Sequence, residues 1–342
     1  MKAARIHAHG GPEVFRLEEA PDPICPPDGV LIEVKAASVN HLDVFVRRGM
    51  PGIKVPFPKI VGADAAGVVK LVGPLVKRIQ PGQRVTVNPG IQCCQCEFCT
   101  SGRGSMCLTY ALLGEHTDGA YAQLVAVPER NVHVLPDAMP FEEAAAYPLV
   151  FLTAWSMLVT KARVKAGDDV LILAAGAGVG TACVQIAKMC GARVYATAST
   201  DEKLEKCRKL GADVLINYKE KPFDAEIRRL TEKRGVDVVI DYVGKDTWQQ
   251  SLRSLRRGGR LVTCGATTGF DPAEDLRHIF YRQVEIRGST MGSMAEFAEV
   301  TRCVFRGQLK PVIDRVLPLS EAPEAHRLIE ARAPFGKIIL KP

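Results

Sequence analysis

The chain has 342 residues, of which 47% are hydrophobic and 24% charged, and its formal net charge is +7. This length exceeds one ordinary core and predicts two domains, while the composition is that of a globular protein. The N-terminal residues lack the apolar core of a signal peptide, and no segment approaches the ~20 apolar residues that span a bilayer. We therefore expect a cytoplasmic protein with no membrane contact. The basic residues are scattered without interleaved aromatic residues, which disfavours nucleic-acid binding.

The N-terminal part of the chain alternates short strand-like segments with turns rich in proline and glycine. Val30–Val34, Ala66–Leu71 and Arg84–Val87 have the alternating character of half-buried strands. Turns such as Pro21–Gly29 separate them. The pattern predicts a small, strongly bent antiparallel β domain, and the last segment, Lys337–Lys341, is expected to be a strand that returns to it.

Four cysteines follow one another at short intervals in this first part of the chain. Their spacing is Cys93-x2-Cys96-x2-Cys99-x7-Cys107. Four thiolates on one loop suit a tetrahedral Zn²⁺ ion, and a shell closed by four sulfurs leaves no position for a substrate. Disulfide bonds are the alternative, but they are rare in a reducing compartment. We therefore predict one structural zinc ion per chain.

After Pro148 the pattern changes to strands that alternate with helices. The predicted strands are Val170–Leu173, Arg193–Thr197, Val214–Ile216, Val236–Asp241, Arg260–Cys264 and Val284–Arg287. Intervening segments such as Glu202–Leu210 and Asp224–Lys233 have helical character. Six strands with helical crossovers predict an α/β domain with a doubly wound parallel sheet.

The first of these strands leads directly into alternating glycines. Val170–Gly180 joins a continuous apolar run to a glycine turn, and Thr181–Cys190 has the residue spacing of a helix. Glycines permit a tight turn and a close approach of the backbone, and a helix N-terminus attracts phosphate. A strand-to-helix turn without a ligand is the alternative. The residues predicted to bind the cofactor phosphates are Gly176, Ala177, Gly178, Val179 and Gly180.

The end of the second strand of this domain bears on the choice of cofactor. A carboxylate here would bind the ribose 2′-hydroxyl of NAD and repel a 2′-phosphate. Ala198 occupies this position, and the first acidic residue, Asp201, follows on the next turn. We therefore favour NADP over NAD, although Ser199-x-x-Glu202 also matches a helix capping box. The residues predicted to hold the 2′-phosphate are Ser199, Thr200 and Lys203.

The order of a β domain, a four-cysteine lobe, a dinucleotide-binding domain and a short return resembles the medium-chain dehydrogenase/reductase superfamily over essentially the whole chain. The resemblance implies a GroES-like, mainly β catalytic domain of residues 1–151 completed by 291–342, and a Rossmann domain of residues 152–290. It also implies that Thr153 lies beside the nicotinamide and that Tyr218 belongs to the 2′-phosphate site. A homodimer or homotetramer is expected.

The sequence departs from the zinc-dependent members of that superfamily at their catalytic metal ligands. In the turn Val39–Asp43, Asn40 stands where those enzymes carry a cysteine, and in Gly62–Gly67 a histidine ligand is replaced by Ala63. The segment before the cofactor domain, Pro148–Val150, carries no cysteine or aspartate ligand. Other features are similar to the quinone oxidoreductase branch, which works without catalytic zinc: the segments Ser38–Asn40, Gly62–Gly67, Leu152–Trp155 and Ala174–Gly180.

These substitutions bear on the reaction. Alcohol oxidation requires a stabilised alkoxide, which zinc supplies as a Lewis acid. Reduction of a quinone or an enone places negative charge on a conjugated oxygen that hydrogen bonds can stabilise. We therefore predict hydride transfer from NADPH to a quinone or an α,β-unsaturated carbonyl, with Asn40 positioning the acceptor oxygen and His41 or water supplying the proton. The catalytic candidates are Asn40, His41 and Asp64.

Two alternatives remain open. A catalytic metal site improvised by the side chains of residues 41, 43, 64 and 116 would make the chain a zinc-containing alcohol dehydrogenase. A protein that binds NADPH without catalysing a reaction is the other alternative. Among the neighbouring residues, Asp43 is expected to hold the turn, and Arg47 and Arg48 to be solvated or to meet a phosphate.

Overall fold

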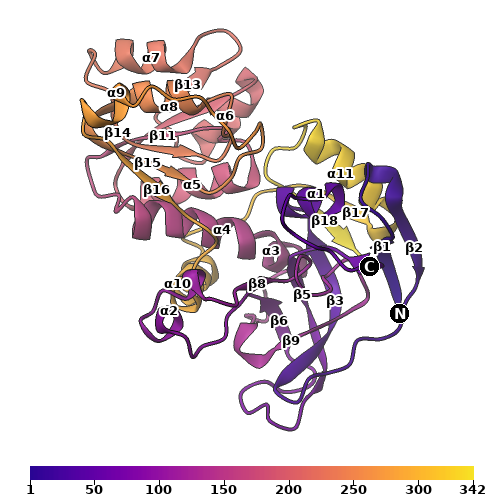
Figure 1. Ribbon diagram of the computed structural model, residues 1–342. Helices are drawn as coiled ribbons and strands as arrows, with labels where there is room; N and C mark the ends of the chain where they lie inside the picture. Colours follow the sequence, from indigo (N-terminus) through magenta and orange to yellow (C-terminus); the bar gives the residue numbers. More distant parts are fainter. The chain divides into compact units, whose positions relative to one another are not determined.

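The structure is a computed structural model that describes all residues from 1 to 342. The chain forms two compact units, which are seen in Figure 1. Unit 1 comprises Met1–Val150 and Ser293–Pro342, and unit 2 comprises Phe151–Gly292. Unit 1 is therefore discontinuous in sequence, and its C-terminal part follows the whole of unit 2.

The largest sheet of unit 1 has seven strands in the order β10-β6-β5-β3-β18-β17, and β9 also pairs with β3. These strands are β3 (Gly29–Ser38), β5 (Asp64–Val72), β6 (Arg84–Val87), β9 (Leu124–Pro128), β10 (Val132–Val134), β17 (Ile313–Pro318) and β18 (Lys337–Lys341). All neighbours are antiparallel except β17 and β18. The expected antiparallel β domain is thus confirmed.

Two smaller sheets and several helices complete unit 1. The additional strands are β1 (Lys2–Ile6), β2 (Phe15–Glu19), β4 (Lys59–Ile60), β7 (Gly90–Ile91) and β8 (Ala111–Leu112). The helices are α1 (His41–Arg48), α2 (Glu97–Thr100), α3 (Phe141–Ala146), α10 (Met294–Phe305) and α11 (Ala322–Glu330), while α4 (Pro148–Trp155) crosses into unit 2. None of the helices has the length and apolar character needed to cross a membrane.

Both faces of the large sheet are covered by apolar clusters. Neighbouring residues of a strand reach different clusters, because alternate side chains point to opposite faces. In β3, Ala37 joins an apolar cluster that also contains Ile6 and Val30. Its neighbour Ala36 joins a second cluster that contains Ala144 of α3. Polar residues in the central strands are therefore also enclosed by protein.

Unit 2 is a parallel sheet in the order β13-β12-β11-β14-β15-β16. The strands are β11 (Asp169–Ile172), β12 (Arg193–Ala198), β13 (Val214–Asn217), β14 (Val236–Asp241), β15 (Leu255–Thr263) and β16 (Glu285–Gly288). All six expected strands are present. The fifth strand, β15, begins at Leu255 and not at the predicted Arg260, and a register irregularity separates its first pair from the others.

The helices of unit 2 connect these strands in crossovers. They are α5 (Gly178–Met189), α6 (Asp201–Lys209), α7 (Phe223–Leu230), α8 (Trp248–Ser254) and α9 (Arg277–Phe280). Figure 1 shows α5 and α7 on opposite sides of the sheet, so the predicted doubly wound arrangement is confirmed. The strand order reverses at β11 and β14, and in such folds ligands bind outside the carboxyl ends of the strands at this point.

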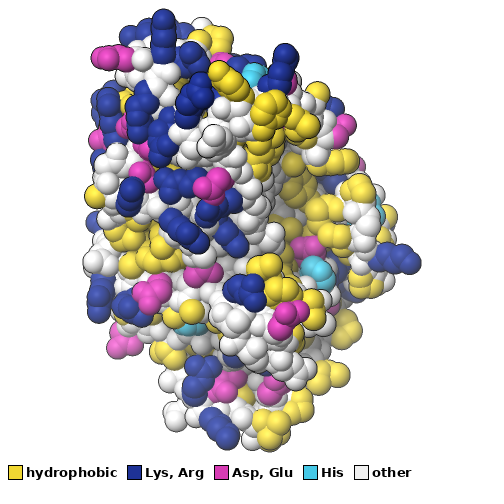
Figure 2. Space-filling view, turned by 60° about the vertical axis from the view of Figure 1, so that its left-hand side comes forward, with side chains coloured by type: hydrophobic (Ala, Val, Ile, Leu, Met, Phe, Trp, Pro, Cys, Tyr) yellow, Lys and Arg dark blue, Asp and Glu magenta, His cyan; other side chains and the backbone are white.

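The net positive charge is concentrated in unit 2. This unit carries 23 Lys and Arg residues against 17 Asp and Glu, so it holds six of the seven excess charges. The basic residues are thus less evenly distributed than the sequence analysis assumed. Figure 2 shows many Lys and Arg side chains on the upper part of the view, which is unit 2.

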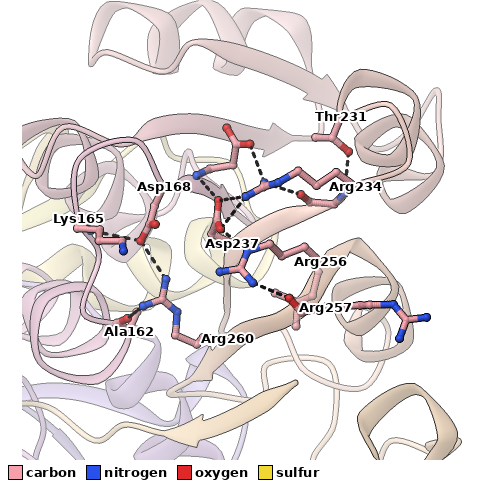
Figure 3. Close-up of polar contacts among 12 residues, drawn as sticks. Ala162, Lys165, Asp168, Thr231, Arg234, Asp237, Arg256, Arg257 and Arg260 are labelled. Atoms are coloured by element: carbon pink, nitrogen blue, oxygen red, sulfur yellow. Dashed lines mark hydrogen bonds and ion pairs between the residues drawn. The ribbon is translucent and has the colours of Figure 1, made fainter. Parts of the chain in front are cut away.

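Several of these arginines are bound to carboxylates near the amino ends of the strands (Figure 3). Arg260 donates to Asp168 at 2.9 Å, and Arg234 donates to Asp237 at 2.9 Å. Arg256 also donates to Asp237. This network lies at the edge of the sheet opposite to the carboxyl ends, and it ties neighbouring strands together.

Candidate active site

The turn between β11 and α5 has the form of an anion site. The strand ends at Ile172 and α5 begins at Gly178. Helix geometry leaves the first N–H groups of α5 without a partner inside the helix, and the helix dipole is positive there. The left-handed residue of the turn is Ala174, with φ of 45°, whereas none of the three predicted glycines has positive φ. The tight turn is therefore not their role.

Gly180 has a packing role instead. A Cβ atom added to it would lie 2.6 Å from the carbonyl oxygen of Ala174 and 2.6 Å from the hydroxyl of Tyr242. That hydroxyl donates to the carbonyl oxygen of Leu173 at 2.6 Å. Gly180 thus lets the start of α5 pack closely against the end of β11, which fixes the direction in which the free N–H groups point.

The predicted 2′-phosphate residues gather at the end of β12. Thr200 caps α6, and its hydroxyl accepts the backbone N–H of Lys203 at 3.3 Å. The cap is therefore Thr200 and not Ser199, one residue later than the sequence motif indicated. The backbone N–H of Tyr218 donates to Ala198 at 3.2 Å, which brings residue 218 beside the end of β12.

Two further side-chain contacts of unit 2 involve Asp201 and Thr153. The carboxylate of Asp201 accepts a hydrogen bond from the Asn217 side chain at 3.0 Å. Thr153 lies on α4 with only 5% of its surface exposed, and its hydroxyl donates to the sulfur of Met291 at 3.6 Å. The residues present thus fit a dinucleotide, with donors at α5 and hydroxyls at the start of α6.

The four cysteines converge on one point of unit 1. One sulfur from each of Cys93, Cys96, Cys99 and Cys107 lies within 4.8 Å of every other. Four thiolates around a tetrahedral zinc ion at 2.3 Å would be roughly 3.8 Å apart. The sulfurs of Cys93 and Cys99 are 3.9 Å apart, which fits this geometry. No cysteine of the chain forms a disulfide.

Backbone amides support the negative charge that such a site requires. The N–H of Cys93 points at the sulfur of Cys107 at 3.3 Å, and the N–H of Cys96 points at the sulfur of Cys93 at 3.4 Å. Hydrogen bonds from backbone N–H groups lower the pKa of Cys93 and Cys96, whereas desolvation raises the pKa of Cys99 to about 12. The loop is thus preorganised for a closed metal site, and Cys94 is exposed beside it.

The catalytic candidates meet because of the register of the large sheet. Ser38, the last residue of β3, pairs with Asp64 in β5 and with Ile339 in β18. Side chains two residues apart in a strand share a face, so Lys337 lies on the same face as Ile339. Asn40 lies two residues after the end of β3. Three segments distant in sequence are thereby brought to one place.

Asp64 is the centre of this arrangement and is fully buried. One carboxylate oxygen accepts from Ser38 at 2.8 Å, from the Asn40 amide at 2.9 Å and from Lys337 at 3.3 Å. The other accepts the backbone N–H of Leu149 at 2.9 Å. Lys337 has 3% of its surface exposed, and it also donates to the carbonyl oxygen of the Asn40 side chain. Burial lowers the pKa of Lys337, and the Asp64 carboxylate opposes this effect.

A second set of buried groups supports Asn40 from the start of α1. The carboxylate of Asp43 accepts the backbone N–H of Asn40 at 2.8 Å and the hydroxyl of Tyr121 at 3.1 Å. Asp43 therefore holds the turn, as expected. Burial raises the pKa of Asp43 to about 7. The Tyr121 hydroxyl lies 3.5 Å from Nε2 of the fully buried His326.

The other residues named from the sequence have different surroundings. His41 begins α1, and part of its side chain is exposed. The protein around the ring still removes enough water to lower the pKa of His41, and the positive charge of Arg332 lowers it further. Arg47 is not solvated, contrary to expectation: its side chain is fully buried and paired with Glu330. It lies on the inner face of α1, whereas Arg48 is 60% exposed and contacts the same carboxylate at 2.7 Å.

The structure does not assemble the improvised metal site. Apart from the four cysteines, no three His, Cys, Asp or Glu side chains lie close enough to hold one ion. His116 is instead a local acceptor, which receives the backbone N–H of Leu112 at 3.1 Å. Sequence reasoning missed Lys337, Tyr121 and His326, because each meets the site only through long-range contacts. The one available signal is a lysine directly before the apolar run Ile338–Leu340.

A discontinuous β unit with a four-cysteine lobe, joined to a parallel-sheet unit with an anion site at its first helix, defines a two-domain nicotinamide-dependent oxidoreductase. The alcohol dehydrogenase GroES-like domain model matches residues 26–137, and the zinc-binding dehydrogenase model matches residues 178–306. The chain belongs to the medium-chain dehydrogenase/reductase superfamily.

Relatives across the full length carry several activities in their names. The chain is 34% identical to a 2-haloacrylate reductase of a Burkholderia species, covering 100% of this chain and 99% of that protein. It is 32% identical to the quinone oxidoreductase of Sus scrofa, covering 99% and 97%. A solved structure of an NAD-dependent alcohol dehydrogenase matches with 46% identity, complete coverage of both chains and a TM-score of 0.96.

Proposed function

We propose that this oxidoreductase transfers hydride from NADPH to a quinone or an α,β-unsaturated carbonyl compound without a catalytic metal ion. The observation that carries the proposal is the saturation of Asp64 by four donors, one of them the buried ammonium of Lys337. A metal ion here would have to displace a cation that is already bound. The names of the quinone oxidoreductase and the 2-haloacrylate reductase agree with this reaction class.

The residues of unit 1 suit the charge that such a reaction develops. The reduced nicotinamide supplies a hydride when it is bound. Attack on the conjugated acceptor moves an electron pair onto its carbonyl oxygen, and a proton from water or His41 completes the reduction. Asn40 is the proposed donor to that oxygen, since one of its amide hydrogens makes only a long bond, 3.4 Å, to the carbonyl oxygen of Ser38. Because the lowered pKa of His41 favours a neutral ring, water is the better source of this proton.

The preference for NADPH is supported by the end of β12. The first carboxylate after the strand, Asp201, is turned to Asn217. Thr200 accepts a backbone N–H, which leaves its O–H hydrogen as a donor, and Tyr218 is held beside Ala198. One similar structure is described as NAD-dependent, so the test below compares NADPH with NADH.

The test combines metal analysis with turnover. Freshly purified protein is analysed for zinc, and oxidation of NADPH and NADH is followed with a panel of quinones, enones and aldehydes. One zinc per chain, with reduction of quinones or enones that survives mild chelation, supports the proposal. Two zinc ions per chain, with alcohol oxidation that is lost with the more labile one, would establish the alcohol dehydrogenase alternative.

A further inference from the structure

Lys337 is the buried cation nearest to the proposed oxyanion donor. It comes from β18, near the C-terminal end of the chain, and its side chain is 4% exposed. Its ammonium has three hydrogens, of which one is directed to the Asn40 carbonyl oxygen and one to Asp64. Burying a charge of this kind is costly unless it is paired, so its retention at this position calls for a reason.

The contacts of Asn40 supply that reason. A side-chain amide can be inserted in two orientations, and only one of them places the carbonyl oxygen toward an ammonium. In the structure that oxygen faces Lys337, and the amide nitrogen faces Asp64 at 2.9 Å. The cation and the carboxylate therefore fix the same orientation from opposite ends.

The same contacts strengthen the amide as a donor. An ammonium group bound to the carbonyl oxygen withdraws electron density from the amide nitrogen, which makes its N–H groups better donors. Hydrogen bonds linked in this way reinforce one another in a low-dielectric interior. The amide hydrogen that faces Ser38 is the one with a long bond, 3.4 Å. It is the hydrogen available to an incoming carbonyl oxygen.

We propose that Lys337 is a positioning residue of the reductase site, which orients and polarises the Asn40 side chain so that its second N–H stabilises negative charge on the acceptor oxygen. This inference rests on the proposed function for its catalytic meaning. Its physical core, an ammonium bound to the Asn40 carbonyl oxygen, does not depend on turnover.

The test is a double-mutant cycle with a matched control. Lys337→Met is expected to lower kcat by about tenfold while Asn40 is present, and by less than about twofold in an Asn40→Ala background, because Lys337 acts through Asn40. The control is Lys59→Met, since Lys59 is also a buried lysine of unit 1, with 2% exposure, but donates to the Thr117 carbonyl oxygen. It is expected to change kcat by less than about twofold.

Lys337→Met leaves the Asp64 carboxylate without its cation, although three hydrogen-bond donors remain, and this loss also destabilises the fold. The variant that combines Lys337→Met with Asp64→Asn removes both charges and keeps the shape, and it is examined in parallel. Because the Asp64 carboxylate also orients the Asn40 amide, the kcat of this double variant is compared with that of Asp64→Asn alone. If Lys337 is merely structural, the two kcat values should be equal, which would overturn the proposal. A lower kcat in the double variant, at equal or higher thermal stability, supports it.

A spectroscopic readout separates this inference from the proposed function. In ¹H–¹⁵N spectra the side-chain amide signal of Asn40 is identified by its loss in Asn40→Ala. It should shift in Lys337→Met and stay in place in Lys59→Met. An unmoved signal, or equal losses of kcat in both Asn40 backgrounds, would overturn the proposal. If the wild type reduces no acceptor, the proposed function fails, and the amide signal still decides whether Lys337 polarises Asn40.

Discussion

The cofactor site and the proposed acceptor site are built in contrasting ways. The turn at the start of α5 and the four-cysteine lobe are each made by one short stretch of chain. The Asp64 site instead joins residues from β3, β5 and β18, and the contact between Asp64 and Lys337 spans 273 positions. Contiguous sites depend on local geometry, whereas the assembled site depends on sheet register. Each should therefore fail in its own way when it is perturbed.

The four-cysteine lobe should lose its metal ion almost completely when one ligand is removed. Cys96→Ser removes one of four thiolates, so zinc measured by elemental analysis should fall from one ion per chain to nearly none. The effect should stay local, with protease cleavage appearing in residues 93–107 while unit 2 remains intact.

The control is Cys94→Ser, which changes an exposed thiol outside the cluster and should keep the zinc. Full zinc content in the Cys96 variant would mean that this cysteine is not a ligand.

The assembled site should suffer the largest loss of global stability. Asp64→Asn leaves Lys337 buried without its carboxylate, and breaking a buried pair in this way costs about 3–5 kcal/mol. Denaturant unfolding provides the measurement. Asp28→Asn is the control, because Asp28 is 57% exposed and its pair with Arg130 is long, at 3.4 Å. Equal losses in the two variants would refute the special status of Asp64.

A substitution in the contiguous cofactor site should lower the affinity for the cofactor. Gly180→Ala places a Cβ against backbone that cannot move away cheaply, so the start of α5 must shift. We expect NADPH affinity, followed by fluorescence titration, to fall about 100-fold, or about 2.7 kcal/mol. Gly288→Ala, which meets nothing within 4 Å, is the control in the same unit. Undiminished binding would show that close packing at Gly180 does not position the phosphate donors.

The smallest expected effect concerns His326. Burial, followed by the nearby charge of Arg47, lowers the pKa of His326 to about 3. Below pH 6.5 the unfolded chain binds a proton that the folded chain refuses, so stability falls as the pH decreases toward 3. The slope is roughly 1.4 kcal/mol per pH unit for one such group. His326→Gln should remove this part of the slope between pH 5 and 6.5.

His7→Gln serves as the comparison, because that ring is exposed. Asp43 contributes with the opposite sign, since its raised pKa of about 7 makes the folded state lose stability as the pH rises from about 4 to 7. The difference between wild type and His326→Gln cancels this contribution. An unchanged slope would contradict the role of His326.

These contrasts also explain what could be predicted from sequence. The strands of unit 2 are continuous apolar runs between glycine turns, so their positions along the chain can be predicted from the sequence. The spacing of the four cysteines likewise predicts that their sulfurs meet at one point. Asn40 and Asp64 were recognised only through the resemblance, and Lys337 escaped notice because nothing near position 337 records that β18 lies beside β3. Arg47 was misjudged for a related reason: α1 hides one of two adjacent arginines.

The discontinuity of unit 1 has a consequence for biosynthesis. A chain emerging from the ribosome contains all of unit 2 before β18 has been made, so unit 2 can fold while Asn40 and Asp64 still lack their ammonium partner. Until β18 has emerged, a nascent protein can hold a nucleotide site without a finished acceptor site. β18 is thus required to balance the charge of Asp64, and a chain cut short before residue 337 would leave that carboxylate without its cation.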